Sequence, residues 1–367
     1  MIARRMGLID ASGIRKVFDL ARNMTDPVNL SIGQPDFDVP EPVKQSAIES
    51  ISAGMNRYTV TQGIPELHEA LKEHLKSTRG VEPEALLVTS GVSGGLVLAF
   101  LTLLDPGDEV VIPDPYFVMY KHLVHLAGGR TKFVDTYPHF RLHRGALEAA
   151  ITSHTKMLVL NSPCNPTGIT YGRDDLETAA QVAREHDLLV LSDEIYDSFC
   201  YSGEYVSMAS IYPKTLLMGG FSKSHAMTGW RLGYACGPEE IIAEMTKLQQ
   251  FSFVCAPSFA QQAGVVALTC STDEAREAYR AKRDLIYEGL KDNFEVEKPD
   301  GAFYIFPKAP WGTDQAFVEE AIKNNLLIIP GRVFSERTTH FRISYAAAED
   351  TLKRGIDILN RLAQDRR

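Results

Sequence analysis

The sequence predicts an α/β protein with a large, mostly parallel-sheet domain and a smaller α+β domain, and two observations support this prediction. First, apolar runs of strand length alternate with amphipathic stretches of helix length, which is the pattern of α/β units around a parallel sheet. Second, after about residue 270 the chain changes to a charged helical stretch followed by short apolar runs. We therefore expect the large domain over residues 45–270 and the small domain over residues 1–44 plus 271–367.

Six apolar runs bounded by turn residues are the predicted strands of the large sheet. They cover residues 86–90, 109–113, 157–161, 188–192, 216–219 and 232–236. Residues 92–104 are apolar nearly all round and stop at Asp-Pro-Gly, which predicts a buried helix. In the small domain we expect short strands at residues 302–306 and 326–330, and a last amphipathic helix over residues 348–363.

The composition favours a small-molecule partner. Of the 367 residues, 44% are hydrophobic and 23% charged, as in ordinary globular proteins. The net charge of -9 gives no basic face for nucleic acid. The five cysteines are scattered, which argues against a disulfide framework and a zinc site. Charges interrupt the N-terminal sequence, and no run is long enough to span a bilayer, so we expect a cytoplasmic protein with neither a metal nor a membrane partner.

Three segments point to the chemistry: NSPCNPTG at 161–168, SDEIYDSF at 192–199 and GGFSKSHAMTGWRLGY at 219–234. Their order and spacing resemble those of the class I aminotransferases, pyridoxal 5'-phosphate (PLP) enzymes of fold type I. The resemblance extends over nearly the whole chain, from LSIGQPDFDVP near residue 30 to FRISYA at 341–346. It implies a transaminase that moves an amino group from an L-amino acid to a 2-oxo acid, with 2-oxoglutarate as the expected acceptor, by a ping-pong mechanism.

The resemblance assigns the catalytic groups to these segments. Lys223 stands where the family attaches its cofactor, and a lysine whose pKa is lowered by burial and nearby cations can serve as nucleophile and base. Asp193 matches the carboxylate that keeps the pyridine nitrogen protonated. Tyr196 and Asn165 match the two groups that hydrogen-bond the cofactor's ring oxygen. By residue type alone, these four could be a surface lysine, a helix N-cap, a buried tyrosine with a structural partner and a turn asparagine.

The phosphate of the cofactor needs fixed donors and a cation. Arg231 lies eight residues after Lys223, at the family's spacing for its phosphate arginine. The loop SGVSGG at 90–95 follows a predicted strand and opens a predicted helix, so its backbone N–H groups could complete the cradle. A tight strand-to-helix turn is the competing interpretation of these glycines. The further residues that the resemblance implies here are Gly91, Val92, Ser93 and Ser222.

Two aromatic residues match family positions near the cofactor. Phe117 corresponds to the ring that stacks on the pyridine face, although most phenylalanines simply belong to the core. Tyr58 resembles the tyrosine that reaches across a dimer interface to the neighbouring subunit's phosphate. The second match implies a homodimer with shared sites, and an ordinary turn tyrosine is the alternative.

The resemblance also implies a clamp for the α-carboxylate that all amino acids share. Arg342 would hold the carboxylate with a bidentate guanidinium, with Asn165 and the backbone N–H of Gly33 beside it. For Arg342 the alternative is a strand arginine paired with a surface acid.

The preferred donor depends on other groups. Aspartate-preferring relatives carry a lysine at the position that matches Ser93, and the segments DASGIRKVFDLA and GAFYIFP look similar to aromatic and broad-specificity enzymes. We therefore expect aromatic or other apolar donors alongside weaker use of aspartate, with either a flexible cation such as Arg332 or a water-filled pocket to receive dicarboxylates. Two other functions fit the same resemblance. A β-lyase would use the same site, and a non-catalytic regulator would keep only the fold.

Overall fold

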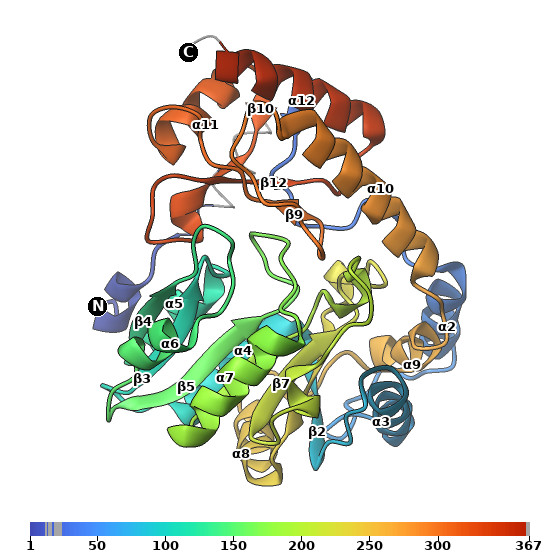
Figure 1. Cartoon of the computed structure of the whole chain (residues 1–367). Helices are drawn as coiled ribbons and strands as arrows, with labels where there is room; N and C mark the ends of the chain where they lie inside the picture. The colour runs from blue at the N-terminus through green and yellow to red at the C-terminus, as the bar shows by residue number, and fades with distance from the viewer. Residues whose placement is uncertain (12, 14–16, 18–23, 365–367) are drawn as a thin grey trace.

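The computed structural model describes residues 1–11, 13, 17 and 24–364, and a seven-stranded sheet forms its centre (Figure 1). The order of the strands is β2-β8-β7-β6-β5-β3-β4, and β8 alone runs opposite to the other six. The strands are β2 (Ala85–Ser90), β3 (Glu109–Asp114), β4 (Arg130–Asp135), β5 (Thr155–Asn161), β6 (Leu189–Asp193), β7 (Thr215–Gly220) and β8 (Leu232–Gly237).

Helices cover both faces of this sheet because successive strand residues point to opposite sides. In β5, Val159 packs in the core shared with α4 and α8, whereas Leu158 and Leu160 pack in the core under α6 and α7. The helices around the sheet are α2 (Glu41–Ser52), α3 (Pro65–Arg79), α4 (Gly91–Leu103), α5 (Met119–Leu126), α6 (Arg144–Ala150), α7 (Arg173–Glu185), α8 (Glu239–Gln250) and α9 (Ser258–Ala267). Strands buried on both faces explain the nearly continuous apolar runs in the sequence.

Among the described residues, two small sheets and the helices α10, α11 and α12 lie beyond one end of the large-sheet strands (Figure 1). β1 (Val28–Asn29) pairs in parallel with β10 (Leu326–Leu327). β12 (Phe341–Ser344) lies between β11 (Ile329–Pro330) and β9 (Tyr304–Ile305), antiparallel to both. The helices are α10 (Asp273–Leu290), α11 (Asp314–Lys323) and α12 (Glu349–Gln364), and α12 packs along α10.

The six predicted strands of the large sheet all form, with ends displaced by at most two residues. The edge strand β4 was not predicted, because its RTKFVD sequence alternates only weakly and half of its residues are partly exposed. The predicted run at 326–330 is two short strands rather than one, because the chain leaves β1 after Leu327 and joins β12 at Ile329. The domain boundaries near residues 45 and 270 stay a prediction.

The structure also bears on the expectations about membrane spans, metal ligands and cysteines. In the part of the chain that the structure describes, no helix is long and apolar enough to cross a membrane. The same residues hold no cluster of three or more His, Cys, Asp or Glu side chains suited to a metal ion. All five cysteines are free thiols, and the cytoplasmic location stays a prediction. The DASGIRKVFDLA segment, which contributed to the expected donor, lies largely outside the described residues.

Substitution of Gly233 tests how closely β8 packs against the first turn of α4. A Cβ atom on this residue would lie 2.7 Å from the backbone of Gly91 and Val92, which cannot move independently of the helix. Gly233→Ala should therefore lower the free energy of unfolding by about 1–3 kcal/mol, measured by urea denaturation. Gly145→Ala is the matched control, since no atom lies within 4 Å of its added Cβ, and it should be neutral or stabilising. Equal stability of Gly233→Ala and the unmodified protein would contradict this account of the packing.

Candidate active site

A cavity of about 240 Å³ opens where β5 and β6 end, with the first turns of α4 and the loop after β7 as further walls. Carboxyl ends of neighbouring parallel strands lie at the same edge of a sheet, where α/β proteins bind their ligands. Two small-sheet residues close the cavity, Tyr304 from β9 and Arg342 from β12. The predicted site residues that line it are Gly33, Val92, Ser93, Phe117, Asn165, Asp193, Tyr196, Ser222, Lys223, Arg231 and Arg342.

Asp193 is the last residue of β6 and is almost completely buried. Its carboxylate accepts a hydrogen bond from the Tyr120 hydroxyl at 2.7 Å and a longer one from the Ile195 N–H at 3.3 Å. Burial raises the pKa of Asp193 to about 6, although these two donors and the nearby Lys223 favour the charged form. The carboxylate is thus anionic at neutral pH and can keep a proton on a basic ligand nitrogen.

Lys223 follows β7, and its Nζ donates to the backbone oxygen of Gly33 at 2.7 Å. Burial of the amine lowers its pKa to about 8, with the positive charges of Arg342 and Arg231 acting in the same direction. Asp193 opposes this shift without cancelling it. A large fraction of Lys223 is therefore the neutral amine at mildly alkaline pH, which is the form that attacks a carbonyl carbon.

Arg231 provides a cation at the N-terminus of α4. Its backbone is left-handed (φ 56°), and its guanidinium donates to the carbonyl oxygens of Thr228 and Ser90 at 3.0 and 3.3 Å. Gly91 does not line the cavity itself. A Cβ atom there would lie 2.7 Å from Arg231 Nη2, so the glycine leaves room for the guanidinium. Together with the free N–H groups of the helix, this cation suits an anionic group.

Arg342 is almost fully buried, and its guanidinium is held on several sides. Nη1 donates to Asn165 Oδ1 at 2.9 Å, and Nη2 donates to the Ser31 carbonyl oxygen at 2.8 Å. The rings of Tyr304 and Phe334 each lie with their centroids 4.6 Å from the guanidinium carbon. The Nε atom has no hydrogen-bond partner among the described residues. A buried donor without a partner costs stability, so binding of a ligand that brings an acceptor to Nε would be favoured here.

Five cavity residues were not named as site residues from the sequence: Leu96, Asn161, Ile195, Thr228 and Tyr304. Asn161 is the first residue of the NSPCNPTG segment, and its amide donates to the carbonyl oxygen of Asp193 at 3.0 Å. Tyr304 belongs to GAFYIFP, and its hydroxyl lies 2.9 Å from that of Tyr196. The segments were thus noticed, but only the fold places these side chains in the cavity.

Two other predicted residues lie outside the cavity. Tyr58 is 84% exposed in the single chain, so its expected contact with a neighbouring subunit stays a prediction. The suggestion that Arg332 is free to bind dicarboxylates is wrong. Its guanidinium pairs with the fully buried Asp314, with Nη2 2.6 Å from Oδ1 and Nε 3.0 Å from both carboxylate oxygens.

Comparison with known proteins identifies relatives along the whole chain. Residues 25–359 match the family model described as aminotransferase class I and II. The chain is 38% identical to a probable aspartate aminotransferase of Methanocaldococcus jannaschii, covering 99% of this chain and 100% of the relative. It is 36% identical to aromatic-amino-acid aminotransferase 2 of Thermococcus litoralis, covering 100% and 99%. The solved structure of the Thermus thermophilus aspartate aminotransferase with maleate superposes with a TM-score of 0.94 at 37% identity, covering 99% of both chains.

The lowered pKa of Lys223 predicts how its reactivity depends on pH. When cofactor-free protein is mixed with PLP and reduced with borohydride, the labelling rate should rise with pH up to about 8 and then level off. An amine with the ordinary lysine pKa of about 10.4, such as N-acetyl-lysine, should still gain reactivity above that pH. Peptide mapping identifies the labelled residue. Label on another lysine, or a rate that keeps rising beyond pH 10, would contradict the assignment.

Proposed function

The chain belongs to the class I and II aminotransferases, a family of PLP enzymes, and we propose that it transfers the amino group of an L-amino acid to a 2-oxo acid with PLP held through Lys223. The resemblance inferred from the three sequence segments is thereby confirmed at the level of the family. The observation that supports the proposal most directly is the position of one amine, Lys223, in a cavity with the buried Asp193 carboxylate and the guanidinium groups of Arg231 and Arg342.

The donors around the cavity suit PLP. Arg231 and the N-terminus of α4 would hold a dianionic phosphate, with Ser222 beside them. Asp193 would hold the proton of the pyridine nitrogen, and Phe117 offers a ring to the pyridine face. When bound, PLP supplies an electron sink for the negative charge that develops at the substrate α-carbon. These roles follow the family pattern and remain our proposal for this chain.

Lys223 would serve as the base that takes the α-proton of the substrate and returns it. Its neutral form is accessible near pH 8, so the proton can move in either direction at modest cost. Tyr196 and Asn165 would donate hydrogen bonds to the cofactor's ring oxygen. The Tyr304 hydroxyl, 2.9 Å from that of Tyr196, would orient this donor.

Arg342 would bind the α-carboxylate that donor and acceptor share. The unpaired Nε of Arg342 could donate a hydrogen bond to this carboxylate. The rings of Tyr304 and Phe334 beside the guanidinium keep its plane in place. A fixed carboxylate orients the Cα–H bond toward the base. Because one clamp would serve both substrates, the first oxo acid must leave before the second binds, which is the order of a ping-pong mechanism.

The remaining walls of the cavity favour apolar donors. Val92, Leu96 and Ile195 are apolar, and Ser93 carries no charge. Arg332, the other cation considered, is occupied by Asp314. We propose that aromatic or other apolar amino acids are used more efficiently than aspartate, with 2-oxoglutarate as acceptor. The names of the relatives include both aspartate and aromatic aminotransferases, so both donor classes occur among similar chains.

The ratio of kcat/KM values for different donors tests this preference. With 2-oxoglutarate as acceptor, phenylalanine and tyrosine should exceed aspartate, and Ser93→Lys should raise aspartate relative to phenylalanine by about tenfold or more, as expected for a new charge pair worth about 2 kcal/mol. Ser93→Ala is the control and should leave the ratio unchanged. A strong aspartate preference in the unmodified enzyme would contradict the assignment. Pyruvate and ammonia released without an acceptor would indicate a β-lyase instead.

We also propose a homodimer in which Tyr58 reaches the phosphate end of the neighbouring site. Tyr58 is exposed in the single chain, and so are several apolar side chains close to it in sequence. They are Ile48, Ile51, Met55 and Val60. An apolar surface of this kind on one chain is consistent with a protein partner.

Mixed dimers test the shared site. Tyr58→Phe removes a phosphate donor, and Lys223→Ala removes the cofactor attachment. If Tyr58 acts on the neighbouring subunit, a hybrid of the two variants has one intact site and one doubly altered site. Activity after mixing should therefore exceed the mean of the two separate variants, up to about half of the unmodified value for a pure hybrid. An active monomer in sedimentation would rule the arrangement out.

A further inference from the structure

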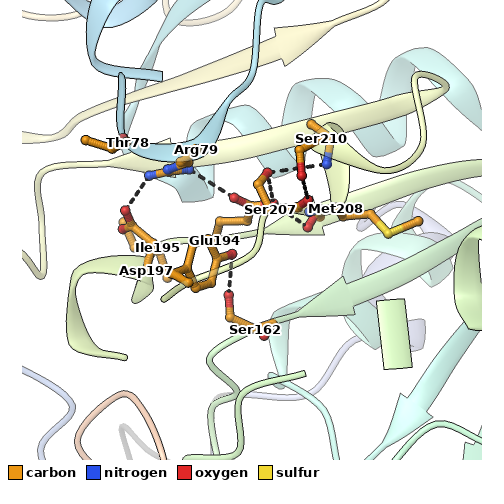
Figure 2. Close-up of polar contacts among 12 residues, drawn as sticks. Thr78, Arg79, Ser162, Glu194, Ile195, Asp197, Ser207, Met208 and Ser210 are labelled. Atoms are coloured by element: carbon orange, nitrogen blue, oxygen red, sulfur yellow. Dashed lines mark hydrogen bonds and ion pairs between the residues drawn. The ribbon is translucent and has the colours of Figure 1, made fainter. Parts of the chain in front are cut away.

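A largely buried network of ion pairs joins Arg79 to Glu194 and Asp197, in the turn that follows Asp193 (Figure 2). Arg79, the last residue of α3, donates through Nη1 to Glu194 Oε2 at 3.0 Å and through Nη2 to Asp197 Oδ2 at 2.5 Å. The side chains of Arg79 and Glu194 are 3% and 0% exposed, and that of Asp197 is 14% exposed. None of the three lines the cavity.

The turn divides its side chains between two environments. Asp193 and Tyr196 line the cavity, whereas Glu194 and Asp197 bind Arg79. Since these four residues share one short stretch of backbone, moving one pair must move the other.

Glu194 is also held from its other side. Its Oε1 accepts hydrogen bonds from the Ser207 hydroxyl at 2.8 Å, the Ser192 hydroxyl at 2.9 Å and the Met208 N–H at 3.2 Å (Figure 2). The backbone N–H of Glu194 donates to the Met218 carbonyl oxygen in β7. The turn is therefore attached to α3, to β7 and to the segment around residue 207.

We propose that Arg79 is a positioning residue: by holding Glu194 and Asp197 with one guanidinium, it fixes the turn that presents Asp193 and Tyr196 to the cofactor. The inference rests on the proposed function, because it assumes that these two side chains contact PLP. The planar fork of an arginine can donate to two carboxylates in different directions, which the single ammonium of a lysine does less well.

The charges around the network make the arginine hard to replace. Without it, the carboxylates of Glu194 and Asp197 would be unpaired next to Asp193, and like charges raise the pKa of a carboxyl group. The other ionisable groups that face Arg79 are His74 on α3, Tyr205, and Tyr234 and Cys236 on β8. His225 faces Asp197. Burial and the charge of Arg79 lower the pKa of His74, so in the intact network His74 is neutral near pH 7 and Arg79 supplies the positive charge. Asp193 itself faces Tyr120 and Lys223.

The test uses the full-length PLP-loaded enzyme with the variants Arg79→Met, Arg79→Lys and Asp197→Asn. Three quantities are measured: the PLP retained after dialysis, the pH midpoint of the cofactor's visible absorbance, and kcat and KM for the amino donor. Arg283→Met is the matched control. Arg283 is equally buried and donates to the Pro299 carbonyl oxygen and Asp284, but it lies outside the cavity and the turn.

Loss of the Arg79 guanidinium should affect the cofactor itself. In Arg79→Met, kcat should fall on the order of 10²-fold, as for a small misplacement of catalytic groups, with a smaller change in KM. The pH midpoint of the cofactor's absorbance should rise by roughly half a pH unit or more. If Asp193 holds the proton of the pyridine nitrogen less well, the ring repels the proton on the Lys223 nitrogen less, so that nitrogen keeps its proton to higher pH. Retained PLP should fall. Arg79→Lys and Asp197→Asn should give smaller changes in the same direction, while Arg283→Met lowers only the melting temperature.

A network that only stabilises the fold would give a different result, which overturns the proposal. If the Arg79 and Asp197 variants melt at lower temperature but keep the midpoint, the retained PLP and kcat within twofold of the unmodified enzyme, the network only stabilises the fold. Should Arg79→Met not fold, the two conservative variants decide between these results. Failure of the unmodified protein to bind PLP would refute the proposed function, and it is seen before any variant is made.

Discussion

Three carboxylates within five residues lie at the end of β6, two of them buried and the third 14% exposed, and the rest of the site depends on this constraint. Asp193, Glu194 and Asp197 would each lose hydration without compensation unless a donor or a cation met them. Tyr120 from α5 meets the first, and Arg79 from α3 meets the other two. The two helices are therefore tied to the carboxyl edge of the sheet by polar contacts as well as by their apolar faces.

Inside the cavity, burial brings the pKa values of an acid and a base closer together. It raises the pKa of Asp193 to about 6 and lowers that of Lys223 to about 8. In water the two groups would differ by more than six pH units. At neutral pH Asp193 therefore stays an anion that can hold a proton on a ring nitrogen, while part of Lys223 is the neutral amine that can take a proton from an amino acid α-carbon. Arg231 and Arg342 contribute to the shift of Lys223, so the groups that suit two anions also tune the amine.

The division of the cavity between shared and variable contacts explains how similar chains can carry the names of aminotransferases for different amino donors. The residues assigned here to the cofactor and the α-carboxylate would contact features common to every substrate. The apolar walls at Val92, Leu96 and Ile195, with Ser93, leave few positions to distinguish side chains. A family model that matches residues 25–359 therefore supports the reaction class, whereas the donor depends on individual side chains.

The sequence alone determined six of the seven large-sheet strands, the buried helix after β2, the family, and the segments that bear Lys223, Asp193 and Arg342. These features follow from local patterns. Apolar residues recur along the sequence with the period of the helix or strand that buries them, and the chemistry requires particular residues at particular spacings. Only the tertiary structure decided the partners: Tyr120 with Asp193, Tyr304 with Tyr196, Arg79 with Glu194, and Arg332 with Asp314. The first three pairs are separated by 73, 108 and 115 residues. No local pattern encodes such contacts, because a hydrogen bond depends on distance and direction in space, and these exist only once the strands and helices have packed.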